Sequence, residues 1–240
     1  MSSVRTRIVD ELRHLLGFIC SPRRRHPIHV AAPELMCRIV ILLGVNALFT
    51  LAIAFPIQTG LESLVGMHAV VDSSTITFLF SVVFVAPWLE ELIFRAGLRS
   101  ATVTLAIQPM LVCLMLGQWR IALALACVSI AIVLVDGYRQ RRRNASEQFA
   151  LRMARGRAFL SRYRLIVWTY ALAFGLSHLG HFDVDAHAGW LALLVVFAVI
   201  SQTWSGLLLS YLRLRYGLLS AIVFHTSFNA AALAIDQVTR

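Results

Sequence analysis

The stretch Phe84-Val-Ala-Pro-Trp-Leu-Glu-Glu-Leu-Ile-Phe-Arg95 places three ionisable side chains, Glu90, Glu91 and Arg95, in a segment that is otherwise apolar enough to cross a membrane. Each charged side chain at the centre of a bilayer costs about 2.5 to 3.5 kcal/mol on insertion scales. Three such costs approach the total stability of a typical fold, about 5 to 15 kcal/mol. Because charges inside membrane spans face a bundle interior or a polar cavity, the stretch predicts a helical bundle with an internal polar site.

The composition of the whole chain agrees with this prediction. The 240 residues are 59% hydrophobic and 14% charged, and the mean hydropathy is +0.76. Soluble domains are nearer half apolar and a quarter charged, so we expect an integral membrane protein with an all-α, polytopic transmembrane helix bundle. About seven spans are expected, within a range of about six to eight. The apolar runs that could form them lie near 35–57, 74–97, 101–117, 121–136, 164–182, 189–212 and 217–235.

The arginines predict the orientation of these spans. All 22 basic residues are arginine, the net charge is +10, and most arginines lie in the first 38 residues or in 139–164. Arginines that flank spans stay in the cytoplasm, so we expect a cytoplasmic N-terminus and outward loops near 58–73, 118–120 and 183–188. The same placement favours the lipid bilayer over nucleic acid as partner. An arginine-only composition is typical of a GC-rich genome, so we expect a bacterial cytoplasmic membrane.

Two regions lie outside the predicted spans. Residues 1–34 form a cytoplasmic arm, in which the amphipathic pattern of 4–19 predicts a helix at the membrane interface and Arg23 to Pro27 form a basic anchor. Residues 35–236 form the membrane-embedded domain, which includes the Arg-rich cytoplasmic loop 137–163. The Asn144-Ala-Ser-Glu147 sequence in that loop predicts a helix cap. A surface helix and a solvated connector both remain open for this loop.

The spacing of the acidic stretch suggests two roles. Glu91 and Arg95 are four residues apart and share a helical face, so we expect an ion pair between them. Glu90 is rotated by about 100° and has no obvious partner in the sequence. A desolvated carboxylate without a cation suits a general base that activates water. The alternative is a structural Glu-Arg-Glu cluster that ties helices together.

Two further apolar segments carry histidines. His225 and Asn229 are four residues apart and can direct two donors at one point, which is the chemistry of an oxyanion hole. His178 follows Phe174 at the same interval and could orient the attacking water or share a proton with it. Interhelical hydrogen bonds by these side chains are the alternative. His181 and His187 lie at a span end, where interfacial histidines need no catalytic role.

Other hydrolytic chemistries fit less well. There is no HExxH sequence and no pair of aspartates deep in a span. Ser205 with His225 is the candidate for a serine protease, but Thr203 and Trp204 lack the small side chains of a nucleophile turn. A zinc site remains an alternative, since Glu90, His178, His181 and His225 are ligands that zinc accepts. The preferred interpretation requires no cofactor, because a zinc there would occupy the proposed base.

Taken in order, Glu90-Glu91-x-x-x-Arg95, Phe174-x-x-x-His178 and His225-x-x-x-Asn229 resemble the three motifs of the CPBP intramembrane protease family. That family contains type II CAAX prenyl endopeptidases and bacteriocin-processing or immunity proteins, and the resemblance covers about residues 74 to 235. It implies a helical bundle around a polar cavity, with Glu90 activating water, His178 assisting, and His225 with Asn229 stabilising the oxyanion. The family is often labelled a metalloprotease, but the resemblance is closer to a metal-free glutamate mechanism.

The sequence therefore predicts an intramembrane endopeptidase that cleaves a CAAX-like or bacteriocin-type membrane-associated substrate. A non-catalytic immunity or scaffold protein, a zinc-dependent protease and an ion-coupled transporter remain alternatives, and the sequence indicates no oligomeric state. The predicted boundaries leave one conflict. At 1.5 Å per residue, Glu90 lies about 10 Å and His178 about 20 Å from the cytoplasmic side. We expect either the second span to continue past Arg99 or the fifth to begin after Arg164.

Overall fold

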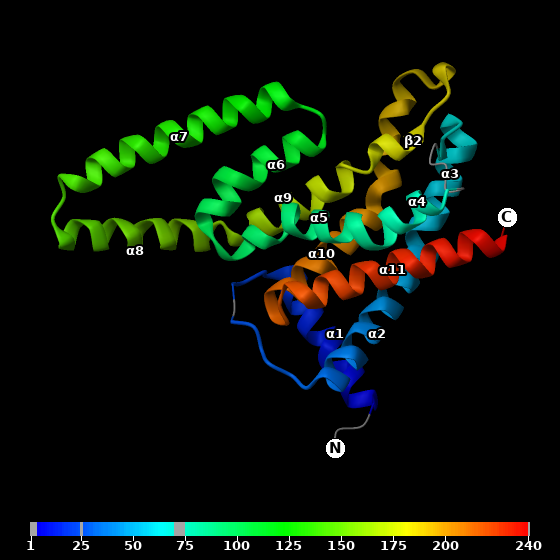
Figure 1. The fold of residues 1–240 in the computed structure, drawn as a ribbon. Helices are drawn as coiled ribbons and strands as arrows, with labels where there is room; N and C mark the ends of the chain where they lie inside the picture. Colours follow the sequence, from blue (N-terminus) through cyan, green and yellow to red (C-terminus); the bar gives the residue numbers. More distant parts are fainter. Residues whose placement is uncertain (1–3, 25, 70–74, 240) are drawn as a thin grey trace.

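The chain folds into helices almost throughout, as predicted (Figure 1). The computed structural model describes residues 4–24, 26–69 and 75–239, with the side chains of 4, 69, 186–188, 190–192 and 236–239 outside the description. The α-helices are α1 (Val4–Cys20), α2 (Ala32–Phe49), α3 (Phe55–Val65), α4 (Ile76–Phe80), α5 (Ala86–Phe94), α6 (Gln108–Met115), α7 (Trp119–Arg141), α8 (Ala145–Ser161), α9 (Tyr163–Leu176), α10 (Ile200–Arg215) and α11 (Leu218–Thr239). The remaining helical turns are η1 (Thr50–Ala54), η2 (Ser81–Val85), η3 (Ala96–Arg99), η4 (Val103–Ile107), η5 (Leu179–His181) and η6 (Ala186–Val199).

The core lies where α9 and α10 pack against each other, with α1, α2, α5 and α11 around them, whereas α7 and α8 extend away from this bundle (Figure 1). Phe94, Phe174 and Leu208 are among its fully buried side chains. Two short strands, β1 (His68–Ala69) and β2 (Phe182–Asp183), pair antiparallel. They join two loops that the arginine pattern assigns to the same side of the membrane.

Among the described residues, three helices contain a π-helical segment, and each segment lies shortly before a proline. η1, η2 and η4 end two residues before Pro56, Pro87 and Pro109. A proline removes its own N–H and its ring displaces the carbonyl four residues earlier, which lies inside the π segment in each case. The wider π turn absorbs that displacement without ending the helix. Long apolar helices therefore continue through these prolines.

Five of the described helical runs are long and apolar enough to cross a membrane. They are Ala32–Val65, Ile76–Arg99, Trp119–Arg141, Leu193–Arg215 and Leu218–Ile235. About seven spans are therefore not confirmed. The predicted span 101–117 is the shorter apolar helix Val103–Met115, and the predicted span 164–182 is the 14-residue α9, followed by a turn and β2. The chain is an integral membrane protein.

Helix α1 forms over the predicted residues but docks onto the bundle through a buried charge. Glu11 is fully buried, and its carboxylate accepts hydrogen bonds from Tyr211 (2.7 Å), Tyr216 (2.8 Å) and Arg38 (2.5 Å). The amphipathic pattern of this helix did not predict the contact, because an acidic residue on an amphipathic helix is expected to face solvent. The arm is thus attached to α2 and α10. Arg25 of the predicted basic run lies outside the described residues.

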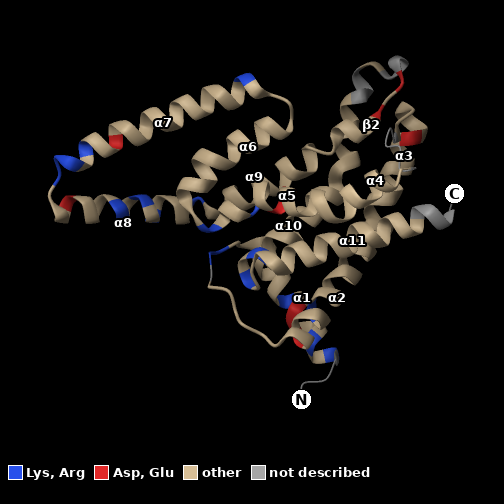
Figure 2. Cartoon of the chain, in the orientation of Figure 1, with Lys and Arg blue, Asp and Glu red and all other residues tan. Residues whose placement is uncertain are grey.

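The Arg-rich loop contains α8, which begins with the predicted cap. The Asn144 side chain accepts from the Glu147 N–H at 2.8 Å, and the Glu147 carboxylate accepts from the Asn144 N–H at 3.2 Å. Arg155 donates two hydrogen bonds of 2.6 Å to Asp136 of α7. Figure 2 shows arginines gathered at the end of α7 that adjoins α8, along α8 and around α1. The 137–163 segment is therefore helical on both sides of its turn.

Close packing of α9 against α10 predicts a sensitivity at Gly175. A Cβ at this position would overlap the Thr203 hydroxyl oxygen and lie 3.1 Å from the Thr203 backbone nitrogen. We expect Gly175→Ala to destabilise the protein by about 1 to 3 kcal/mol, because the α10 backbone must move to admit the methyl group. Thermal unfolding of the purified protein measures this loss. Gly156→Ala on α8, where a Cβ meets open space, is the control and should leave the melting temperature unchanged or slightly raised.

Candidate active site

The acidic stretch lies at the end of α5, where the helix stops and the chain turns. Helix α5 ends at Phe94, and the terminal carbonyls are satisfied by side chains from elsewhere. Arg213 donates to the carbonyls of Arg95 and Ala96 at 3.2 Å each, and Gln108 donates to the carbonyl of Ile93 at 2.9 Å. Sequence reasoning missed Arg213 and Gln108, although a polar residue in an apolar run is a visible signal. These contacts hold the end of α5 in place.

The ion pair between Glu91 and Arg95 is present and fully buried. Arg95 Nη1 donates to Glu91 Oε1 at 2.8 Å, and the two side chains are 1% and 0% exposed. The Arg95 guanidinium also lies over the ring of Phe174, 3.9 Å from its centre. A cation over an aromatic face is stabilised by the ring quadrupole, more strongly when both are desolvated. Arg95 is therefore fixed from two sides.

His225 lies between the two carboxylates, which corrects one prediction. Its Nδ1 is 3.1 Å from Glu91 Oε1, and its Nε2 is 3.6 Å from Glu90 Oε2. Glu90 was predicted to have no partner, but the packing of α11 against α5 brings this imidazole beside it. A separation of 3.6 Å is longer than a hydrogen bond, so Nε2 is not committed to Glu90. The Glu90 side chain is 20% exposed, whereas that of Glu91 is not exposed at all.

His178 joins the cluster through Phe174. Its Nδ1 lies 2.8 Å from the Phe174 carbonyl oxygen, and its ring meets the Phe174 ring edge-on at 4.8 Å. A carbonyl only accepts, so Nδ1 carries the proton and Nε2 is left as an acceptor. Phe174 also contacts His225, with ring centres 5.8 Å apart. Among the described residues, His178 makes no hydrogen bond with either carboxylate.

One N–H of the Asn229 side chain is already hydrogen-bonded within the protein. Its side-chain nitrogen donates to the carbonyl of Val82 at 2.9 Å, and Val82 lies in the π-helical segment η2. The π turn before Pro87 thus supplies an acceptor for α11. A carboxamide nitrogen has two N–H groups, so one remains for a ligand.

His178, His225 and Asn229 line one cavity of about 280 Å³. Other polar side chains complete its wall, and sequence reasoning missed most of them: Thr50, Gln58, Ser201 and Gln202. Their signal is a set of hydroxyl and amide groups inside runs that are otherwise apolar. Glu90 is not among the described residues that line the cavity. Its carboxylate lies beside the cavity, next to His225.

The difference in depth between Glu90 and His178 is resolved in a way that neither predicted alternative describes. Helix α5 ends at Phe94, before Arg99, and α9 begins at Tyr163, before Arg164. The rings of Phe94 and Phe174 nevertheless meet edge-on at 5.3 Å. Glu90 and His178 are each four residues from one ring of that pair. The crossing of α5 and α9 therefore brings the two levels together, which rise per residue alone could not show.

The other sequence candidates are placed as follows. Ser205 lines the cavity, but its hydroxyl donates to Asn46 at 3.0 Å, which leaves it without an activating base. The His181 ring lies 5.3 Å from that of His178, and the side chain of His187 is outside the described residues. Within the described part of the chain, no three His, Cys, Asp or Glu side chains are grouped as a metal site requires. The predicted zinc ligands are thus not gathered into one set.

The fold and this site define a helical membrane protein with a buried carboxylate–imidazole cluster beside a polar cavity. Residues 71–231, two thirds of the chain, match the family described as Rce1-like, type II CAAX prenyl endopeptidase Rce1-like. The chain belongs to this family of proteases, as the motif resemblance predicted. All six predicted site residues lie within the match. No curated protein and no solved structure matches the chain.

Proposed function

We propose that this protein is an intramembrane endopeptidase that hydrolyses a peptide bond of a membrane-associated substrate. The observation that carries the proposal is the position of His225, which contacts Glu91, lies beside Glu90 and lines the same cavity as His178 and Asn229. A base, a donor pair and a space for a peptide thus adjoin one another. This is the arrangement that water-dependent peptide hydrolysis requires.

The chemistry assigns one step to each group. Glu90, the partly exposed carboxylate, takes a proton from water, and the hydroxide formed attacks the peptide carbonyl carbon. The carbonyl oxygen becomes an oxyanion that accepts hydrogen bonds from the second N–H of Asn229 and from Nε2–H of His225, which acts here as an imidazolium because its other proton is held on Nδ1 by the Glu91 carboxylate. Protonated Glu90 then gives its proton to the leaving amine, and the C–N bond breaks. His178 Nε2 holds the water by accepting its other proton in a hydrogen bond.

Glu91 and Arg95 have a positioning role in this proposal. The Glu91 carboxylate contacts Nδ1 of His225, so it fixes the ring and keeps a proton on Nδ1. Arg95 neutralises Glu91 in the membrane interior. The substrate class proposed from the family is a prenylated CAAX peptide, with a bacteriocin-type peptide as the alternative. We propose that the protein lies in a bacterial cytoplasmic membrane with its N-terminus on the cytoplasmic side. CAAX-like termini would be presented on that side.

A cleavage assay with and without chelator tests the metal-free form of this proposal. The purified protein in liposomes is given a farnesylated, internally quenched CAAX peptide, and we expect the rate to be unchanged after treatment with EDTA or 1,10-phenanthroline. The reason is that Glu90, His178 and His225 are not grouped as ligands of one ion. A rate that falls with chelator and returns with added zinc would support the zinc-dependent alternative and contradict ours. Complete absence of cleavage of CAAX and bacteriocin-type peptides would favour a scaffold, and ion-driven flux would favour a transporter.

A further inference from the structure

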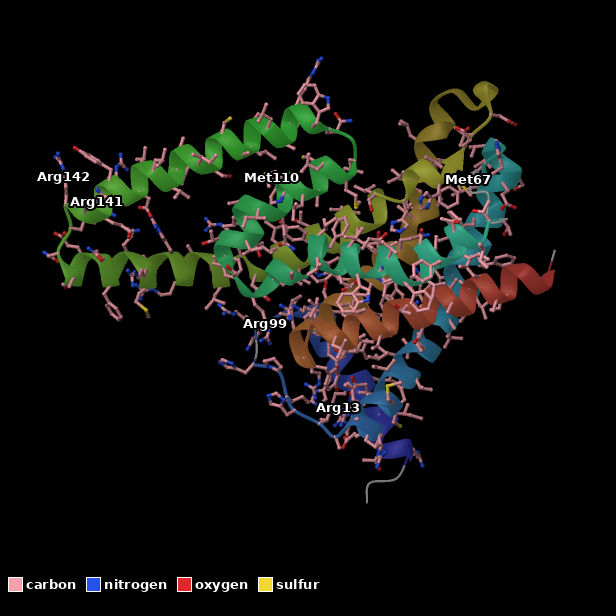
Figure 3. The ribbon with its side chains drawn as sticks, in the orientation of Figure 1. Arg13, Met67, Arg99, Met110, Arg141 and Arg142 are labelled. Carbon is pink, nitrogen blue, oxygen red and sulfur yellow. The ribbon has the colours of Figure 1, made fainter. Side chains whose placement is uncertain are left out.

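A second cavity, of about 350 Å³, lies between the N-terminal arm and the end of α10. It is separate from the candidate active site, since the described residues that line the two cavities have no member in common. Arg13 and His14 of α1, Arg23 and His26 of the arm, and Arg215 of α10 supply its basic groups. Arg13 is labelled in Figure 3, on the side of α1.

The cavity is cationic and lacks an internal counter-charge. None of the described residues that line it is acidic. The nearest ion pair of a lining arginine is Arg13 with Asp10, at 4.0 Å between exposed side chains, which contributes little. Glu11 contacts the lining residue Tyr211, but its carboxylate is fully buried and already bound by Arg38, Tyr211 and Tyr216. The positive charge of the lining arginines is therefore available to a ligand.

The structure holds the wall of this cavity in position. The N–H of Ile28 donates to the carbonyl of Arg215 at 2.8 Å, which fastens the arm across the end of α10. The Arg215 guanidinium donates to the Tyr216 hydroxyl at 3.0 Å and lies 5.5 Å from the centre of that ring. Arg215 is thus oriented by an aromatic ring rather than by a carboxylate. A guanidinium held in this way presents its remaining N–H groups to an anion.

The surroundings indicate a lipid surface. The cavity lies at the α10–α11 turn, at one end of two helices that can cross the membrane. Exposed apolar side chains adjoin it in the chain: Ile28, which lines the cavity, is 39% exposed, and Leu16, next to the lining residue Gly17, is 60% exposed. Basic pockets at the cytoplasmic ends of membrane helices are typical binding sites for anionic headgroups, and acyl chains need adjoining apolar surface. The volume is within the usual range for a small-molecule site.

We propose that Arg13, Arg23 and Arg215 form a binding site for the phosphate of an anionic phospholipid headgroup. The bound lipid would fasten the arm and α1 to the membrane surface. The acyl chains would cover the exposed side chains of Leu16 and Ile28. This site acts independently of peptide hydrolysis.

The test is a titration of the purified full-length protein with phosphatidylglycerol or phosphatidylcholine, followed by native mass spectrometry. The main variant is Arg13→Gln/Arg23→Gln, since both side chains are exposed and their loss should not impair folding. Each arginine near an anionic headgroup contributes about a fivefold change in affinity, so we expect about a 25-fold loss for phosphatidylglycerol. The matched control is Arg141→Gln/Arg142→Gln, which removes the same charge at the far end of α7 (Figure 3) and should change affinity less than twofold.

Three outcomes would overturn the proposal. The first is equal retention of the two lipids by the unaltered protein, and the second is an equal loss of phosphatidylglycerol in the main and control variants. The third concerns the source of the phosphate. If inorganic phosphate or glycerol 3-phosphate displaces phosphatidylglycerol at equal concentration, the cavity binds a free phosphate and not a lipid. Adding Arg215→Gln to the main variant should lower the affinity for phosphatidylglycerol by about a further fivefold. The melting temperature of this triple variant is recorded to check that it remains folded.

Discussion

Replacing Glu90 with glutamine is expected to reduce peptide hydrolysis by about 10²- to 10⁴-fold, which is the range for loss of a general base. Glutamine keeps the size of the side chain but cannot take a proton from water. The change removes a charge that is partly exposed and makes no hydrogen bond shorter than 3.5 Å among the described residues. The melting temperature should therefore stay the same or rise, because burying a neutral amide costs less than burying a carboxylate.

The rate is measured on the farnesylated CAAX peptide in liposomes, under single-turnover conditions so that chemistry limits it. The matched control is Glu62→Gln, a substitution of the same type on the exposed face of α3. This control should retain full activity. An unaltered single-turnover rate in Glu90→Gln would exclude Glu90 as the base. A loss of rate together with a fall in melting temperature would instead indicate a structural role for this carboxylate.

Replacing Arg95 with methionine is expected to destabilise the protein by about 3 to 5 kcal/mol. Methionine fills most of the space over Phe174 but leaves the Glu91 carboxylate, which is not exposed at all, without its cation. Removal of one partner of a buried ion pair is costly because the remaining charge stays desolvated. For a chain of this size the loss corresponds to a fall of roughly 6 to 20 °C in melting temperature. Thermal unfolding in detergent measures it.

The double variant Glu91→Leu/Arg95→Met separates stability from chemistry. With both charges removed, no desolvated ion remains, so we expect much of the lost stability to return. Activity should not return, because His225 loses the carboxylate that holds its Nδ1 proton. A double variant as unstable as Arg95→Met alone would show that the arginine acts through packing on Phe174 and not through the ion pair.

Local sequence patterns predicted much of this structure. The i, i+4 spacing of Glu91 and Arg95 predicted their ion pair, and the Asn144-to-Glu147 spacing predicted the cap of α8. Both depend only on helical geometry, which is the same in every protein. The boundaries of the spans were less well predicted. Hydropathy does not indicate that α9 ends at Leu176. It also does not indicate that a π turn precedes each of three helix prolines.

The site was predicted as a set of residue types but not as an arrangement. Glu90 was given no partner because nothing in the sequence near position 90 indicates position 225. Gln58 and Ser201 in the cavity wall were missed because nothing within either helix indicates that the two side chains face the same cavity. The attachment of α1 through Glu11 was missed for the same reason. In each case the partner lies on another helix.

The amino-acid sequence by itself determined that this chain is a helical membrane protein of the Rce1-like family, because hydropathy and motif spacing are properties of single segments. Only the tertiary structure decided that His225 lies between Glu90 and Glu91 and that Phe174 packs below Arg95. Those contacts depend on how α5, α9 and α11 cross. Crossing is set by the packing of side chains from different helices, which no pattern within one helix contains.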